Sequence, residues 1–156
     1  MKLSSLTILN RPGLAFDAVE SNGELFFRGG QSVFALRQGS DSLNWETKLE
    51  NDSRMGEKRL VFDGTTLFTF AALGSGKGVE LHAIDPASGA VLWEKHSIYS
   101  PFKWGFSALD RQVYLAGAGP DGTYSFTVYD GRTGELLQTM ALGKISGIAS
   151  YDSKLI

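Results

Sequence analysis

The sequence contains no cysteine, which excludes disulfides, thiolate metal sites and cysteine nucleophiles but leaves the redox compartment open. Histidine is almost as scarce, with only His82 and His96. Neither is followed, two or four residues further on, by the second ligand that a metal-binding pair needs. His82 is therefore predicted to be a surface or edge histidine, not a ligand or a general base, and no metal ligand is assigned.

An excess of basic charge is also missing. The 156 residues carry 15 Lys and Arg against 17 Asp and Glu, which gives a net charge of −2 without a block of like charge. A nucleic-acid partner is therefore not expected. No stretch approaches the ~20 apolar residues of a membrane span, and the start, MKLSSLTILN, falls short of the ~7 to 15 apolar residues of a signal peptide. We expect no membrane span and no signal peptide in this chain.

Glycine, by contrast, is abundant, at 19 residues, and it punctuates the chain at turn-forming pairs such as Asn22-Gly23, Asp63-Gly64 and Asp121-Gly122. Short runs rich in β-branched and aromatic residues lie between these turns, for example TLFTFAA from Thr66 and YSFTVYD from Tyr124. No window of helical length shows apolar residues at helical spacing. The chain is predicted to be all-β.

A repeated segment refines this prediction. The segments ALRQGSDSLNW, AIDPASGAVLW and VYDGRTGELLQ begin at Ala35, Ala83 and Val128, and each follows a pair of strand candidates. Trp45 and Trp93 are 48 residues apart, and Gln138 lies 45 residues after Trp93. Four-stranded antiparallel units repeating at a period of about 45 residues are typical of β-propeller blades.

The repeats predict one partial propeller domain over residues 1–156. Its blades cover about 14–49, 58–95 and 103–141, and 145–156 would begin a further blade. Closure of a ring takes about 4 to 8 blades, so three blades form an incomplete ring. Either the chain is cut from a longer propeller, or copies complete one another as a homo-oligomer, or the open edges stay exposed.

Within the second repeat, Asp85 to Ser88 offers a carboxylate and a hydroxyl to the local amides, and Gly89 allows a positive φ. These are the features of a tight turn, after which Trp93 would be buried between sheets. Trp45 and Trp93 are both expected to be largely buried.

These residues resemble the repeat of the pyrroloquinoline-quinone-like, or quinoprotein-type, β-propellers, whose blades end in a pattern close to Ala-Leu-Asp-x-x-Thr-Gly-x-x-x-Trp. The resemblance is fullest in the second repeat, whereas the first lacks the Asp and Thr-Gly and the third has Gln138 in place of Trp. It implies that Trp45 and Trp93 dock against the neighbouring blade. The implied structural docking motif comprises Ala35, Trp45, Ala83, Asp85, Ser88, Gly89, Trp93, Asp130, Thr133 and Gly134.

The segments that join successive blades form a candidate binding face because they are rich in the aromatic and basic residues found at binding hot spots. The residues concerned are Arg54, Lys58, Tyr99, Lys103 and Trp104. As an alternative, Trp104 and Phe106 belong to a strand that turns toward the core. The loop GSGKG from Gly74 departs from the phosphate-loop pattern, and a flexible loop is preferred there.

No catalytic residue is assigned. A non-catalytic, protein-binding or scaffolding propeller is the favoured function, with a protein partner. The resemblance also allows a fragment of a quinoprotein dehydrogenase, or a ligand-sensing or glycan-binding envelope propeller. Pyrroloquinoline quinone and Ca²⁺ are not expected here, because no set of oxygen ligands can be aligned. The resemblance suggests the periplasm or cell envelope for a parent protein.

Overall fold

The computed structural model describes residues 17–49, 59–74 and 77–143, with only the backbone described at 103 and 104. These residues form three four-stranded sheets. The first sheet contains β1 (Asp17–Ser21), β2 (Glu24–Gly29), β3 (Ser32–Arg37) and β4 (Leu43–Lys48). The second contains β5 (Leu60–Phe62), β6 (Leu67–Ala72), β7 (Val79–Ile84) and β8 (Val91–Ser97). The third contains β9 (Ser100–Leu109), β10 (Gln112–Ala118), β11 (Tyr124–Asp130) and β12 (Leu136–Gly143).

Each sheet is an antiparallel meander in which strands follow one another in sequence order. Tight turns make this possible. Asn22 and Gly23 have φ values of 51° and 76°, and Asp110 and Arg111 have 51° and 62°. Two successive positive φ values match the right-handed twist of the flanking strands, which is why Asn-Gly joins β1 to β2 so readily.

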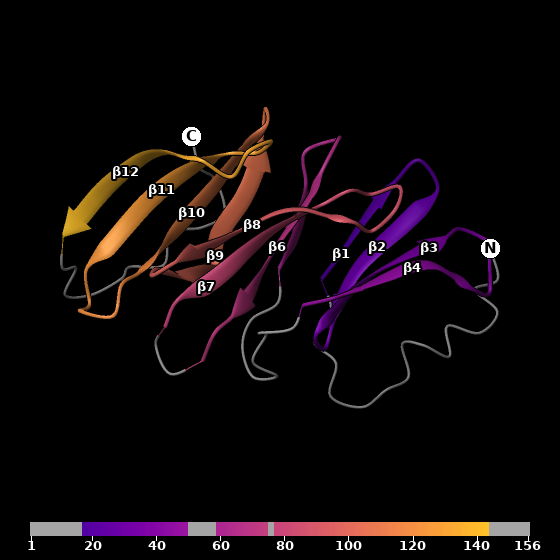
Figure 1. The fold of residues 1–156 in the computed structure, drawn as a ribbon, viewed down its shortest axis with the longest axis horizontal. Helices are drawn as coiled ribbons and strands as arrows, with labels where there is room; N and C mark the ends of the chain where they lie inside the picture. Colours follow the sequence, from indigo (N-terminus) through magenta and orange to yellow (C-terminus); the bar gives the residue numbers. More distant parts are fainter. Residues whose placement is uncertain (1–16, 50–58, 75–76, 144–156) are drawn as a thin grey trace.

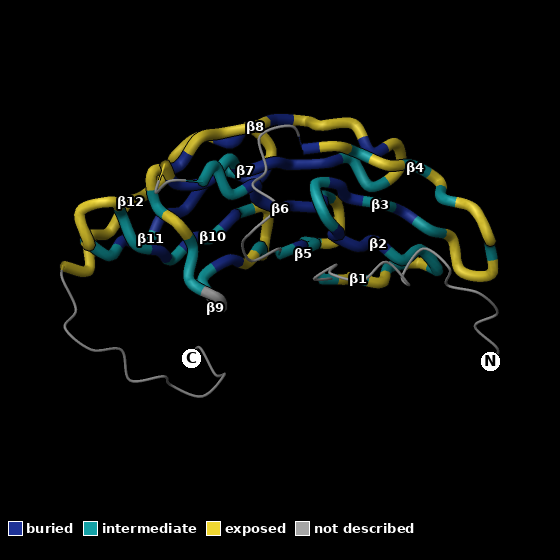
Figure 2. Tube along the Cα trace, turned by 90° about the horizontal axis from the view of Figure 1, so that it is seen from below, coloured by how far each residue is buried: buried dark blue, intermediate teal, exposed yellow. Residues whose placement is uncertain are grey.

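The three sheets stand side by side, with the second sheet between the other two (Figure 1). Together they form an arch, in which β4, β8 and β12 follow the outer side and β1, β5 and β9 follow the inner side (Figure 2). On the inner side β5 contacts both β1 and β9. This arrangement is a sector of a propeller, with the sheets as blades and the inner strands nearest to the axis.

Two apolar layers hold the sheets together. The first and second sheets enclose Phe26, Val33, Ala35, Leu49, Leu60, Leu67, Ala71 and Ile84. The second and third enclose Phe68, Phe70, Val79, Leu81, Ala83, Trp93, Phe106, Val113, Leu115 and Tyr129. The middle sheet is therefore covered on both faces, and successive residues of β7 alternate between the two layers.

A β-bulge recurs at the same place in every repeat. The pairing shifts between Ala35 and Leu36, between Ala83 and Ile84, and between Val128 and Tyr129. In each case the outer strand carries one extra residue directly after its turn, a local device that increases twist and re-aims side chains. As a result Trp45 lies opposite Ala35 and Trp93 lies opposite Ala83.

The predicted fold class is confirmed: the described residues form antiparallel four-stranded blades that do not close into a ring, and they include no helix. The described part of the chain thus has no long apolar helix that could cross a bilayer. The segment 145–156, in which a further blade was predicted to begin, lies outside the described residues.

Candidate interaction site

The turn between β7 and β8 is built by the side chains of its own residues. The Asp85 carboxylate accepts hydrogen bonds from the Ala87 amide at 2.9 Å and from the Ser88 hydroxyl at 2.8 Å. These two bonds, in that order of importance, lower the pKa of Asp85. The Gly89 amide closes the turn on the Asp85 carbonyl at 2.8 Å, with φ of 75° at Gly89.

The turn between β11 and β12 repeats this geometry. Oδ1 of Asp130 accepts from the amides of Arg132 and Thr133 at 2.8 and 2.9 Å. The amide of Thr133 is the largest cause of the lowered pKa of Asp130, followed by that of Arg132. Gly134 has φ of 69°, and its amide donates to the Asp130 carbonyl at 2.8 Å. Both turns are therefore held in one conformation by hydrogen bonds among their own residues.

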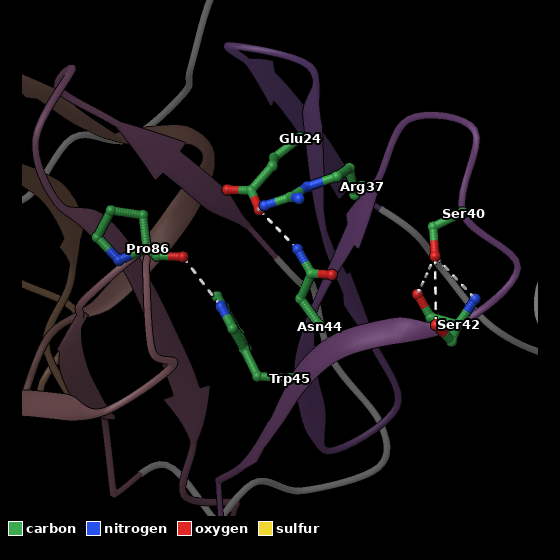
Figure 3. A network of polar contacts seen from close by, with 7 residues as sticks. All are labelled: Glu24, Arg37, Ser40, Ser42, Asn44, Trp45 and Pro86. Carbon is green, nitrogen blue, oxygen red and sulfur yellow. Dashed lines mark hydrogen bonds and ion pairs between the residues drawn. The ribbon is translucent and has the colours of Figure 1, made fainter.

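The first of these turns receives a tryptophan from the preceding sheet. Nε1 of Trp45 donates to the Pro86 carbonyl at 2.9 Å, and Figure 3 shows the indole pointing across the gap between the two sheets. A Cβ atom on Gly89 would lie 2.6 Å from Cδ2 of Trp45, so only glycine allows this approach. The bulge residue Asn44, beside Trp45, instead donates from Nδ2 to Oε1 of Glu24 at 2.6 Å.

The second turn receives Trp93 in the same way. Nε1 of Trp93 donates to the Gly131 carbonyl at 2.9 Å. A Cβ atom on Gly134 would lie 2.9 Å from Cδ2 of Trp93. We call the Trp45 contact with the Pro86–Gly89 turn the first joint, and the Trp93 contact with the Gly131–Gly134 turn the second joint.

The two tryptophans differ in burial. Trp93 is 9% exposed, whereas Trp45 is only half-buried. Trp93 is thus as buried as expected, and the half-buried Trp45 packs against the apolar layer between the first and second sheets. The alanines opposite them, Ala35 and Ala83, are fully buried. Ser88 and Thr133 lie exposed on their turns, where their hydroxyls bind the local Asp carboxylates.

Most residues of the predicted binding face lie outside what the structure describes. Arg54 and Lys58 lie outside the described residues, and the side chains of Lys103 and Trp104 on β9 are not described. Tyr99 is half-buried and packs against the apolar layer between the second and third sheets. Phe106 is buried in that layer, as the alternative interpretation of this segment expected.

His82 is not the surface or edge histidine that was predicted, because it is 3% exposed. Its neighbours Leu81 and Ala83 face the third sheet, so His82 faces the first sheet by the alternation of the strand. Nε2 of His82 lies 3.6 Å from Oε2 of Glu80 and 3.8 Å from Oε2 of Glu94.

Sequence spacing missed this cluster for two reasons. Glu80 precedes His82 by two residues, whereas the spacing considered for a second ligand was two or four residues after the histidine. Glu94 lies opposite His82 only through the pairing of β7 with β8. The available signal was the Glu-x-His pattern, which places both side chains on one face of a strand.

Four large apolar residues of the outer strand β12 were also missed as a group. Leu136, Leu137, Met140 and Leu142 are each 45% to 57% exposed. Within the described residues β12 is hydrogen-bonded to β11 alone and ends the third sheet. We call these four residues the β12 strip.

The chain matches no protein-family model and no curated protein. Among solved structures it resembles a quinohemoprotein alcohol dehydrogenase from Pseudomonas putida HK5, with a TM-score of 0.61 and 18% identity. It also resembles BamB from Moraxella catarrhalis, with a TM-score of 0.59 and 20% identity. A third similar structure is the WD40 domain of Toxoplasma gondii coronin, with a TM-score of 0.58 and 13% identity.

The match to the alcohol dehydrogenase covers 80% of this chain and 20% of the dehydrogenase chain. The match to BamB covers 83% of this chain and 38% of BamB, and the match to coronin covers 83% of this chain and 34% of the coronin chain. The chain thus spans between a fifth and two fifths of their length. The fold is that of part of a β-propeller, with the quinoprotein-type and WD40-type propellers as structural neighbours.

Proposed function

We propose that the chain is a protein-binding section of a non-catalytic β-propeller. The β12 strip is the observation that carries this proposal, because it gathers exposed apolar side chains on one outer strand. Single exposed apolar residues are ordinary on protein surfaces, whereas contiguous groups of them mark contact sites. The joints, by comparison, use their aromatic and turn residues to hold the sheets together.

The partner that fits the strip is an extended, apolar peptide segment of another protein. All eight residues of β12 are exposed, and in the described residues the strand pairs with β11 on one side only. An added strand would use the backbone groups of the other side, while its side chains contact the β12 strip. Affinity would come from backbone hydrogen bonds and specificity from the leucine and methionine contacts.

The test starts from capture of bound proteins by the purified 156-residue chain, followed by reconstitution with the purified partner. A saturable complex measured by calorimetry supports the proposal if the double variant Leu136→Asp, Leu142→Asp weakens it at least tenfold. Leu109→Asp is the matched control, because Leu109 is exposed to 61% but lies on β9. Equal weakening by the control, or no reconstituted complex, would contradict the proposal.

A second candidate is a section of a quinoprotein dehydrogenase, favoured by the similarity to the Pseudomonas enzyme. Within the described residues, the acidic and histidine side chains gather in threes only at Glu80 and His82 on β7 and Glu94 on the outer strand β8. Ca²⁺ requires six to eight oxygen ligands, so this set does not fit a quinone-bound Ca²⁺ ion near the axis. We therefore propose that this section binds neither pyrroloquinoline quinone nor Ca²⁺. Calorimetry with both added would reverse the preference if it showed stoichiometric binding.

The third sheet also has a face turned away from the second sheet, and aromatic pairs lie on it. Tyr114 stacks on Phe126 at 6.0 Å between ring centroids, and Phe102 contacts Tyr124 at 5.2 Å. We propose that a further four-stranded sheet covers this face, either from a longer parent chain or from a second copy. Light scattering on the 156-residue chain separates the two: a defined dimer supports self-completion, and a monomer supports a longer parent. The periplasm or cell envelope is the proposed location of that parent.

A further inference from the structure

Three ligand-type side chains meet on the face of the second sheet that looks toward the first sheet. Glu80 and His82 are two residues apart on β7 and so share a face. Glu94 on β8 is the direct cross-strand partner of His82. One donor atom from each of the three side chains lies within 4.8 Å of the other two.

His82 is an unusual member of such a group because its imidazole is buried and one ring nitrogen is unpartnered. Its side chain is 4% exposed, and Nδ1 has no hydrogen-bond partner. Nε2 faces the two carboxylates but stays beyond hydrogen-bonding distance of them, at 3.6 and 3.8 Å. Buried polar groups are normally paired, so an imidazole whose Nε2 faces two carboxylates without bonding to either is a candidate ligand.

Burial is the largest influence on the imidazole. It lowers the pKa of His82, and this effect outweighs the Glu80 and Glu94 carboxylates, which raise it.

We propose that Glu80, His82 and Glu94 bind one divalent transition-metal ion, with Zn²⁺ as the best fit, at the outer rim between the first two sheets. An imidazole with two carboxylates is a donor set that Zn²⁺ accepts, and three protein ligands leave a position for water. Two ligand atoms of one tetrahedral Zn²⁺ ion lie about 3.4 Å apart. The two separations from Nε2, 3.6 and 3.8 Å, therefore need to close by a few tenths of an ångström, and the two carboxylate oxygens, within 4.8 Å of each other, by at most about 1.4 Å.

The surroundings allow both access and charge balance. Glu94 is 65% exposed in its side chain, so the site opens to solvent on one side. Arg28 of β2 is fully buried and close enough to lower the pKa of His82. Its Nη1 atom donates to the carbonyls of Gly30 and Ser32 at 2.9 and 3.0 Å, which ties the guanidinium to the first sheet. Two carboxylates against one guanidinium leave a net negative charge for the ion to neutralise.

The experiment is a Zn²⁺ titration of the chelator-treated 156-residue chain by calorimetry, with the visible spectrum of bound Co²⁺ as a second readout. We expect one ion per chain, a Co²⁺ spectrum of low coordination number, and a higher Tm in the presence of Zn²⁺. Glu94→Gln should lower the affinity at least tenfold without unfolding the chain, because the side chain is mostly exposed. His82→Gln should abolish the Co²⁺ spectrum.

A matched control separates this site from adventitious binding. Glu135→Gln removes an exposed carboxylate at the turn of the third sheet, away from Glu80, His82 and Glu94. It should leave the affinity unchanged. The proposal is overturned if no saturable binding occurs, or if Glu135→Gln weakens binding as much as Glu94→Gln does. If His82→Gln fails to fold, Glu94→Gln and its control still decide the question.

Discussion

The two joints share one contact but differ in what surrounds it. In each, an indole donates to a turn carbonyl and lies against a glycine that has positive φ. Trp93 is buried and lies 6.0 Å from Phe68 between ring centroids, whereas Trp45 is half-buried and stacks on Phe26 at the same separation. Thr47 adds a hydrogen bond to the Gly89 carbonyl at the first joint. The two joints therefore share the geometry of docking but differ in how far the indole is buried.

This difference predicts unequal costs for removing the indoles. Trp93→Ala should destabilise the chain by about 3 to 5 kcal/mol, as is usual for a large side chain deleted from a core. Trp45→Ala should cost less, about 1 to 3 kcal/mol, because the half-buried ring has less apolar area to lose. Urea unfolding followed by circular dichroism measures both. An equal loss of unfolding free energy in both variants, or no loss in Trp93→Ala, would remove the distinction between the buried and the half-buried indole.

Substitution of the turn glycines tests the same difference between the two joints, because each indole packs closely against one of these glycines. Gly134→Ala and Gly89→Ala each combine unfavourable φ with a Cβ contact under 3.0 Å to an indole. We expect about 1 to 3 kcal/mol of destabilisation, larger at Gly134, since the buried Trp93 has less freedom to shift than Trp45.

Gly122→Ala is the control for that measurement. Gly122 has φ of 78°, similar to the other two, but a Cβ atom there meets nothing within 4 Å. Its replacement therefore reports backbone strain alone, and the excess cost at positions 89 and 134 reports the docking of the indoles. An equal loss of stability in all three variants would show that the indoles do not press on the glycines.

The smallest expected effect is the pH dependence that both joints share. The pKa values of Asp85 and Asp130 are lowered in the folded chain, so these carboxylates bind protons less readily there than in the unfolded chain. Their contribution is complete above the unfolded pKa of about 3.9 and is lost as pH falls through the lower folded value. Both groups are only partly buried, so screening by water keeps the effect small.

The double variant Asp85→Asn, Asp130→Asn checks this assignment. Urea unfolding between pH 5 and pH 2.5 should show a shallower acid loss of stability for the variant than for the parent chain. An unchanged slope would mean that other carboxylates carry the acid sensitivity. A similar slope change from Asp85→Asn and from Asp130→Asn alone would confirm that the two turns are equivalent.

Much of the architecture could be read from particular residues. The strand from Tyr124 to Asp130 was predicted with its observed bounds, because turn residues flank a run of β-formers. The recurring Asp and Gly offsets predicted the turns for the same reason. The bulge near the start of each outer strand was not predicted, since it depends on how the strand pairs and leaves no local signal. Its effect is large because it sets Trp93 opposite Ala83.

The candidate sites were harder to predict. The binding face around Tyr99 remains a prediction, because the structure leaves most of its residues undescribed. The β12 strip was missed because leucine and methionine in a strand normally indicate burial, and only the position of β12 at the end of the third sheet exposes them.

By itself, the sequence determined the repeat and the turns. Each of these depends on φ angles and hydrogen bonds within about five residues of one turn, and the residue types alone determine such local preferences. Only the tertiary structure decided that Trp93 is buried and Trp45 half-buried, and that Glu94 stands opposite a buried His82. Those facts depend on register and on the packing of neighbouring sheets, where residues far apart in the chain share one environment.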